Sequence, residues 1–260
     1  MPSAPYQWIE EPGPPTLAPG SILLTSFPSA GLAATVAAHY IVRGLRLPRI
    51  GLFDSADAAP VAVVQSGLVN PAIRCYGRPN LGIVVSEFPP TISAARPVAD
   101  AILDTAEAKG CRLVLCLEGV VPHPVQDEAV PTTAESVWVV LAREDPAMIK
   151  GLGAAGVRPL EDGVIGGVSG SLLVGGLHRK TPVAALLVSA QGPEGFPDHR
   201  AGAALIETLD RFLPELQIDT KPLRSQAEVI EKALRAAMRG RPKPSELPEP
   251  TPPSDGTMYQ

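Results

Sequence analysis

The sequence predicts an α/β fold of three layers, in which helices cover both faces of a largely parallel sheet. Short apolar runs alternate along the chain with longer segments of helical periodicity, which is the pattern of such folds. Several of these runs are continuously apolar, as expected of strands that are covered on both faces. With 260 residues, 45% of them hydrophobic, the chain is long enough to bury a full core in one or two domains.

The expected strands are short apolar runs that end at glycine, proline or polar residues. They lie at residues 21–27, 49–54, 61–67, 72–77, 81–88, 111–119, 137–142 and 183–190. The run CRLVLCLEG at 111–119 is the clearest example of a strand buried on both faces. Near the N-terminus, Tyr6, Trp8 and Ile9 are expected to dock as a short edge strand.

The expected helices carry recognisable start and stop signals. They lie at residues 31–45, 97–110, 145–156, 200–213 and 222–240. Pro97 stands near the start of the second helix and Gly110 at its end. Asp145 and Pro146 open the third helix as N-cap and first helical residue, and Asp198 is expected to cap the fourth.

Proline accounts for 30 of the 260 residues and gathers at both ends of the chain. Such stretches favour polyproline II or disorder, because they bury too little apolar surface to fold alone. The chain therefore divides into a proline-rich N-terminal arm at 1–20, an α/β domain at 21–240 and a disordered proline-rich tail at 241–260.

Charge and cysteine content argue against several classes of function. The 22 basic and 27 acidic side chains give a net charge of −5, a poor balance for nucleic-acid binding, because phosphate neutralisation needs clustered cations. Cys75, Cys111 and Cys116 lack the spacing of a zinc site or a disulfide framework, and we expect no metal and no other cofactor. No signal peptide or membrane-spanning run is recognised, so a cytoplasmic location is expected.

Two glycine-rich segments resemble catalytic motifs but lack the structural context that those motifs need. Gly151–Gly156 matches GxGxxG, yet it follows a capped helical segment, so we interpret it as a helix end and a turn. Gly167–Ser171 departs from the nucleophile elbow GxSxG at its fifth position. The wider segment 163–176 is interpreted as a loop that approaches other backbone closely, and the sequence has no P-loop for ATP hydrolysis.

Glu87 and Glu118 each follow an apolar run, and the carboxyl ends of parallel strands are where α/β folds place ligand sites. Two interpretations stay open. Either each carboxylate caps a helix or holds a loop amide, or both form a cleft with Ser169 in an enzyme of nucleoside-phosphorylase or hydrolase type. We favour the first interpretation, because no histidine is paired with Ser169 by the sequence.

The sequence ends in Met258, Tyr259 and Gln260: a hydrophobic residue, a tyrosine, and a last residue that carries the free carboxylate. This order resembles the docking signature of proteasome activators. A tether at 241–257 precedes it and would extend roughly 50 Å at ~3.1 Å per residue. We therefore predict that these three residues bind a partner, with no contribution to the folding of the domain.

The order of several motifs resembles that of the proteasome assembly chaperone family of archaea and bacteria, the group that includes archaeal PbaA and PbaB. These motifs are a Phe-Pro-x-x-Gly turn at 27–31, Ser86-Glu87 and Glu118-Gly119 at strand ends, the segment Gly163–Leu173, and Pro197-Asp198 followed by alanines. Gly202 stands where alanine is commoner in the family. The likeness covers roughly residues 20–238, and it implies a strand near 216–219 and a final helix.

The resemblance implies a phosphorylase/hydrolase-like domain that lacks a recognised catalytic set and assembles as a homo-oligomer. It implies a non-enzymatic partner of the 20S proteasome core particle, either an assembly chaperone or an ATP-independent activator. Such a protein would dock Met258–Gln260 into pockets of the α-subunit ring. The helix at 31–45 is apolar nearly all round, which favours a closed cyclic homo-oligomer. The enzyme that uses Glu87, Glu118 and Ser169 is the alternative.

Overall fold

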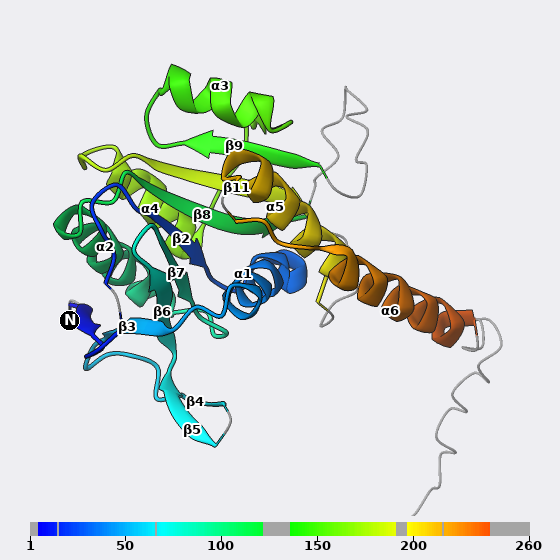
Figure 1. The fold of residues 1–260 in the computed structure, drawn as a ribbon, viewed down its shortest axis with the longest axis horizontal. Coiled ribbons are helices and arrows are strands. Elements are labelled where there is room, and N and C mark those ends of the chain that lie inside the picture. The colour runs from blue at the N-terminus through cyan, green and yellow to red at the C-terminus, as the bar shows by residue number, and fades with distance from the viewer. Residues whose placement is uncertain are drawn as a thin grey trace, which may run out of the picture.

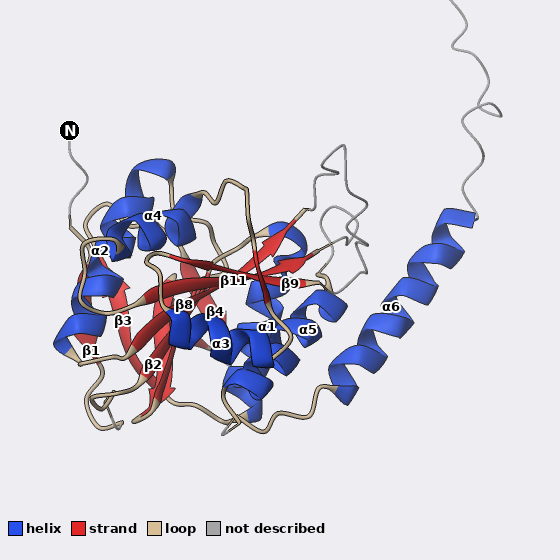
Figure 2. Ribbon diagram, turned by 90° about the horizontal axis from the view of Figure 1, so that it is seen from above, coloured by secondary structure: helices blue, strands red, loops and turns tan. Residues whose placement is uncertain are grey.

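The computed structural model describes residues 5–14, 16–65, 67–121, 136–190, 197–214 and 216–239. Within these ranges the chain forms one nine-stranded sheet with helices on both faces, together with a separate two-stranded hairpin (Figure 1). Seen from above, the sheet lies between two layers of helices (Figure 2). The three-layer α/β fold that the sequence predicts is confirmed.

The large sheet has the spatial order β1-β3-β6-β7-β2-β8-β11-β9-β10. The bounds of its strands are β1 Gln7–Glu10, β2 Ile22–Ser26, β3 Arg49–Asp54, β6 Ile73–Arg78, β7 Leu81–Val85, β8 Leu113–Val120, β9 Val137–Leu141, β10 Arg158–Pro159 and β11 Val183–Ser189. The four central strands, β7, β2, β8 and β11, are parallel, as predicted. The flanks are mixed, because β6, β3 and β1 continue the sheet in antiparallel pairs and β9 runs antiparallel to β11.

The helices are α1 Ala33–Gly44, α2 Ile92–Ala108, α3 Pro146–Ala154, α4 Gly167–Gly176, α5 His199–Phe212 and α6 Lys221–Arg239, with a short 3₁₀ turn at Ala30–Leu32 before α1. The first five helices divide between two apolar cores, one on each face of the sheet. One core joins α1, α3 and α5 to one face of the sheet, and the other joins α2 and α4 to the opposite face. The last helix, α6, packs on α5 through its first turns and then runs away from the domain (Figure 1).

The predicted start and stop signals of the helices are largely confirmed. The carboxylate of Asp145 accepts the backbone N–H of Met148 at 2.9 Å, and that of Asp198 accepts the N–H of Ala201 at 2.9 Å. Gly110 and Gly156 follow helices with φ of 66° and 84°, a left-handed conformation that glycine adopts without strain. The segment at 151–156 is therefore a helix end and a turn, not a dinucleotide site.

The N-terminal arm also docks as predicted. β1 pairs with the outer side of β3, which places Trp8 opposite Phe53 with their ring centroids 5.2 Å apart. Tyr6 is buried just before this strand. Aromatic burial thus fixes a segment whose prolines alone predict disorder.

Three expectations about single elements are wrong. Helix α2 begins at Ile92, five residues before Pro97, because Thr91 caps it by accepting the N–H of Ala94 at 3.3 Å. Residues 216–219 form no strand, since Gln217 adopts a left-handed φ of 50°. The third concerns the glycine-rich segment at 163–176, described next. The expected strand at 61–67 does form, as β4 Ala62–Gln65, and it pairs with β5 Leu68–Pro71 in the separate hairpin (Figure 1).

This glycine-rich segment is mostly a helix, α4, and not a loop. Its last glycines do allow a close approach, but to side chains of neighbouring elements and not to backbone as the sequence predicts. A Cβ atom on Gly175 would lie 2.6 Å from Leu103 of α2, and one on Gly176 would lie 2.6 Å from Val183 of β11. Packing against these neighbours outweighs the low helix propensity of glycine.

We expect Gly176→Ala to lower the free energy of unfolding by about 1–3 kcal/mol, because the added methyl group overpacks the contact with Val183. Gly153→Ala in α3 is the matched control, since nothing described lies within 4 Å of its added Cβ. That control should be neutral or should stabilise the chain by about 0.5–1 kcal/mol. Urea unfolding of both variants measures the difference, and equal effects would contradict tight packing of α4.

Candidate functional site

The carboxyl ends of β7, β2 and β8 meet at one edge of the sheet, where open α/β folds bind ligands. Polar side chains gather there in two groups. The first surrounds Glu87, just after β7, and the second surrounds Glu118, near the end of β8. Both carboxylates were candidates from the sequence.

The first group is an ion-pair network in which Glu87 accepts hydrogen bonds from two elements. Both terminal nitrogens of Arg74 in β6 donate to the two Glu87 oxygens, one of them Nη1 to Oε2 at 2.8 Å. Nε2 of His39 in α1 lies 2.9 Å from Glu87 Oε1. The Arg74 side chain is only 2% exposed, and its Nε donates to the hydroxyl of Tyr76 at 3.0 Å.

Burial alone would raise the pKa of Glu87. The hydrogen bonds and positive charges of His39 and Arg74 outweigh that effect and hold this pKa at about 2. The carboxylate therefore stays ionised and neutralises a buried guanidinium. This is a structural role, but it comes from an ion pair and not from the helix cap or loop amide that the sequence suggested.

The second group joins β8 to α4. The hydroxyl of Ser169 donates to Glu118 Oε2 at 2.6 Å, and the hydroxyl of Ser29 accepts the N–H of Gly119 at 2.8 Å. Burial raises the pKa of Glu118 to about 7, although the hydrogen bonds from Ser169 and Ser29 act in the opposite direction. The carboxyl group of Glu118 therefore titrates near neutral pH.

The two carboxylates face opposite sides of the sheet. Side chains alternate along β8, so Glu118 shares the side of Cys116, in the core of α2 and α4, whereas Leu117 lies in the core of α1 and α5. Glu87 contacts His39 of α1, on the other face. The structure therefore brings Glu118 and Ser169 together and leaves Glu87 apart. The cleft of all three that the enzyme interpretation requires is not formed.

Ser169 is also poorly placed for attack on a substrate. It is 3% exposed, in the first turn of α4. A nucleophile elbow instead presents its serine at the top of the sheet. The observed hydrogen bond is one that a buried serine makes to satisfy its hydroxyl.

The titration of Glu118 has a measurable consequence. Because its pKa is raised, the folded state binds a proton between about pH 4.5 and pH 7 that the unfolded state has lost, so stability falls as the pH rises through this window. We expect Glu118→Gln to remove this fall. The free energy of unfolding of the variant, relative to that of the parent, should therefore be about 1–3 kcal/mol higher at pH 8 than at pH 5. Urea unfolding at both pH values tests this, and an unchanged pH dependence in the variant would contradict a buried, titrating Glu118.

Sequence reasoning missed the basic partners of Glu87. Arg74 stands within the apolar run at 72–77, and a charged residue in a strand covered on both faces signals a buried partner. His39 was visible only as a residue of a helical pattern. Nothing in the sequence shows that these residues meet Glu87, because β6 and α1 are brought to β7 by the tertiary fold.

The predicted partner-binding residues Met258, Tyr259 and Gln260 lie outside the described residues. The nearest described element is α6, which ends at Arg239 and leads away from the sheet (Figure 1). Across the described ranges, no helix is long and apolar enough to span a membrane. Acidic, histidine and cysteine side chains of the same ranges nowhere gather in threes as a metal site requires.

The fold defines a class of three-layer α/β domains that has solved members in archaea. PbaA of Pyrococcus furiosus, described as an archaeal homolog of proteasome-assembly chaperone, superposes with a TM-score of 0.76 at 26% identity, over 90% of this chain and 92% of PbaA. PbaB of the same organism, described as an archaeal proteasome activator, shares the fold with a TM-score of 0.73 at 22% identity, over 92% and 100% of the two chains.

The chain belongs to the PAC2 family, whose family model matches residues 23–238. An uncharacterised protein of Methanocaldococcus jannaschii is 26% identical over 214 residues, which cover 82% of this chain and 84% of that protein. The resemblance that the sequence motifs indicate is confirmed for the domain.

Proposed function

We propose that this chain is a non-enzymatic proteasome-binding protein, acting in the cytoplasm as an assembly chaperone or as an ATP-independent activator. It docks Met258, Tyr259 and Gln260 into pockets of the α-subunit ring of the 20S core particle. The observation that carries the proposal is this C-terminal sequence on a PAC2-family domain. Further support comes from PbaA, described as a homolog of a proteasome-assembly chaperone.

The chemistry of the three residues suits a pocket at a subunit junction. Met258 enters an apolar part, and Tyr259 buries its ring while its hydroxyl finds a polar partner. The carboxylate of Gln260 pairs with a basic group of the ring, a lysine between two subunits. This last contact requires the chain to stop there, because one added residue would displace the charge.

Several tails on one particle would raise the effective affinity. A single flexible tail binds weakly, because ordering it costs conformational entropy. A closed cyclic homo-oligomer would present several identical tails to a ring-shaped partner, provided that each tether spans its pocket. Light scattering at micromolar concentration tests this part, and a monomer would contradict it.

The described site supports a non-enzymatic role. Glu87 neutralises Arg74 within the fold, and Ser169 is buried against Glu118. Pull-down of the cognate 20S core particle by the immobilised full chain tests the proposal. Retention of the core particle supports it, and no retention at micromolar concentration of either partner would contradict it.

A further inference from the structure

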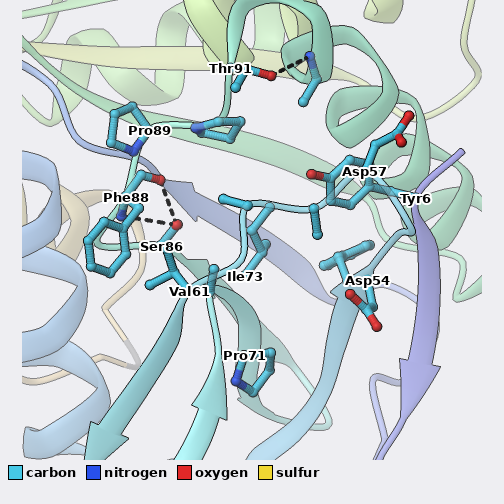
Figure 3. A pocket seen from close by; sticks show the side chains of 16 residues that line it. Tyr6, Asp54, Asp57, Val61, Pro71, Ile73, Ser86, Phe88, Pro89 and Thr91 are labelled. Carbon is cyan, nitrogen blue, oxygen red and sulfur yellow. Dashed lines mark hydrogen bonds between the residues drawn. The ribbon is translucent and has the colours of Figure 1, made fainter. Parts of the chain in front are cut away.

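A small pocket lies where the ends of β3 and β6 meet the segment between β7 and α2 (Figure 3). Phe53, Ile73 and Ala94 of the core of α2 and α4 contribute to its wall. Its volume is about 90 Å³. Because sites for cofactors and drug-sized molecules span roughly 300–1,000 Å³, this pocket fits a side chain or two of a peptide and no larger ligand.

The pocket has an apolar end and an acidic end. Phe88 and Pro89 lie on one side, and Tyr6, Asp54 and Asp57 lie on the other (Figure 3). Among the described residues that line it, two are carboxylates and none is basic. Phe88 keeps 42% of its surface exposed, so part of its ring is accessible to a ligand.

The negative charge at this end of the pocket comes from Asp54 and Asp57, which lie beside Tyr6 (Figure 3). Burial raises the pKa of Tyr6, and the negative charges of Asp54 and Asp57 raise it further. A cation at this end of the pocket would be attracted by both carboxylates and by the face of the phenol ring. The N-terminus of α2 favours an anion, but Thr91 caps it and stands at the opposite, apolar end (Figure 3).

The complementary ligand is therefore an extended segment in which a basic side chain stands next to a proline. Proline rings dock on aromatic and proline surfaces at low entropic cost, because the polyproline II conformation is preformed. The chain itself contains such a segment, Arg241-Pro242-Lys243-Pro244, directly after α6. Its two positive charges match the two carboxylates of the pocket.

The chain's own segment cannot reach this pocket. It starts two residues after Arg239, so Pro244 lies at most about 18 Å from the end of α6. That helix packs on α5, on the face of the sheet opposite to α2, and runs away from the domain (Figures 1 and 2). We propose that residues 241–244 of a second copy of this chain occupy the pocket formed by Tyr6, Asp54, Asp57 and Phe88.

This inference rests on the self-association in the proposed function but not on proteasome binding. It gives the tail a second task. Anchoring at 241–244 would link neighbouring copies and leave residues 245–260 to extend from a fixed point on the oligomer. The 16 residues from 245 to 260 would still span about 50 Å at ~3.1 Å per residue.

The first test uses a fluorescent peptide of residues 241–248. The receptor is the full chain carrying Arg241→Ala and Lys243→Ala, so that its own segment does not compete. We expect saturable binding that weakens with added salt, and Asp54→Asn with Asp57→Asn should weaken it about tenfold or more. Glu161→Gln with Asp162→Asn removes the same charge outside the pocket and should leave binding unchanged. Equal binding by both receptor variants, or no binding at all, would overturn the proposal.

The second test separates a neighbouring copy from the chain itself. A photo-crosslinker at position 245 is placed in the full chain, and isotopically heavy and light chains are mixed before illumination. We expect cross-linked peptides that join heavy to light chains at residues 53–61 or 86–91, and their loss with Asp54→Asn and Asp57→Asn. Cross-links to these residues only within one chain would overturn docking by a second copy. Neither test involves the core particle, so its failure to bind would not affect them.

Discussion

Removal of Met258–Gln260 is expected to reduce binding to the cognate core particle by about 30-fold or more, since a buried aromatic anchor in an interface contributes about 2 kcal/mol or more. Tyr259→Ala and a residue appended after Gln260 should act in the same direction, through loss of the ring and displacement of the carboxylate. Stimulation of peptidase activity, where present, should fall with binding. The measurement is titration of the core particle with each variant, by binding and by cleavage of a fluorogenic peptide.

Ser254→Ala is the matched control for these variants, because it changes the same tail without touching the three terminal residues. Unfolding midpoint and oligomer size should be the same in all variants, since the proposed docking residues take no part in the described core. If deletion, substitution and extension all bind like the parent chain, the tail is not the docking element.

Breaking the ion pair of Arg74 and Glu87 is expected to be the most destabilising single change in the domain outside its apolar core. Glu87→Gln leaves the Arg74 guanidinium, 2% exposed, without its carboxylate. Removing one partner of a fully buried ion pair lowers the free energy of unfolding by about 3–5 kcal/mol. Because Glu87 is partly exposed, we expect a loss of about 2–3 kcal/mol here. Arg74→Met combined with Glu87→Gln should recover much of the loss, because no unpaired charge is then buried.

Acid should have a related effect. The pKa of Glu87 is lowered to about 2, so its stabilising contribution is complete above the unfolded value near 4.5 and is lost as the pH falls toward 2. Urea unfolding from pH 7 to pH 3 should show a smaller acid loss in Glu87→Gln than in the parent. The exposed pair of Arg96 and Asp100 supplies the control, since Asp100→Asn should cost less than about 0.5 kcal/mol. Equal costs for the two substitutions would contradict a buried ion-pair network.

Local signals in the sequence account for most of the domain. The continuous apolar runs locate the parallel strands, and the caps at Asp145 and Asp198 locate two helix starts within one residue. Prediction fails where tertiary contacts outweigh local preference. Helix α4 forms despite its glycines, because they allow contact with α2 and β11. The start of α2 is displaced because Thr91 caps a first turn whose Ala94 and Ala95 are buried, and Pro97 is accommodated inside the helix.

The sequence predicts which residues belong to the candidate site, but not how they are arranged in space. That Glu87 and Glu118 follow strands is visible from the sequence, but the face on which each lies depends on the parity of its position after the strand. Glu118 lies within β8 and faces α4, whereas Glu87 lies beyond β7 and faces α1. Arg74 and His39 reach Glu87 through pairing of β6 with β7 and packing of α1, which no local pattern shows.

The most direct test of the central claim is electron cryomicroscopy of the full chain mixed with its cognate 20S core particle. The proposal predicts a homo-oligomer on the α-subunit ring, with density for Met258, Tyr259 and Gln260 in pockets between α subunits and the terminal carboxylate beside a basic side chain. Tyr259→Ala should leave the pockets empty under the same conditions. A bound chain whose pockets are empty, or core particles that carry no added density at saturating concentration, would contradict the claim.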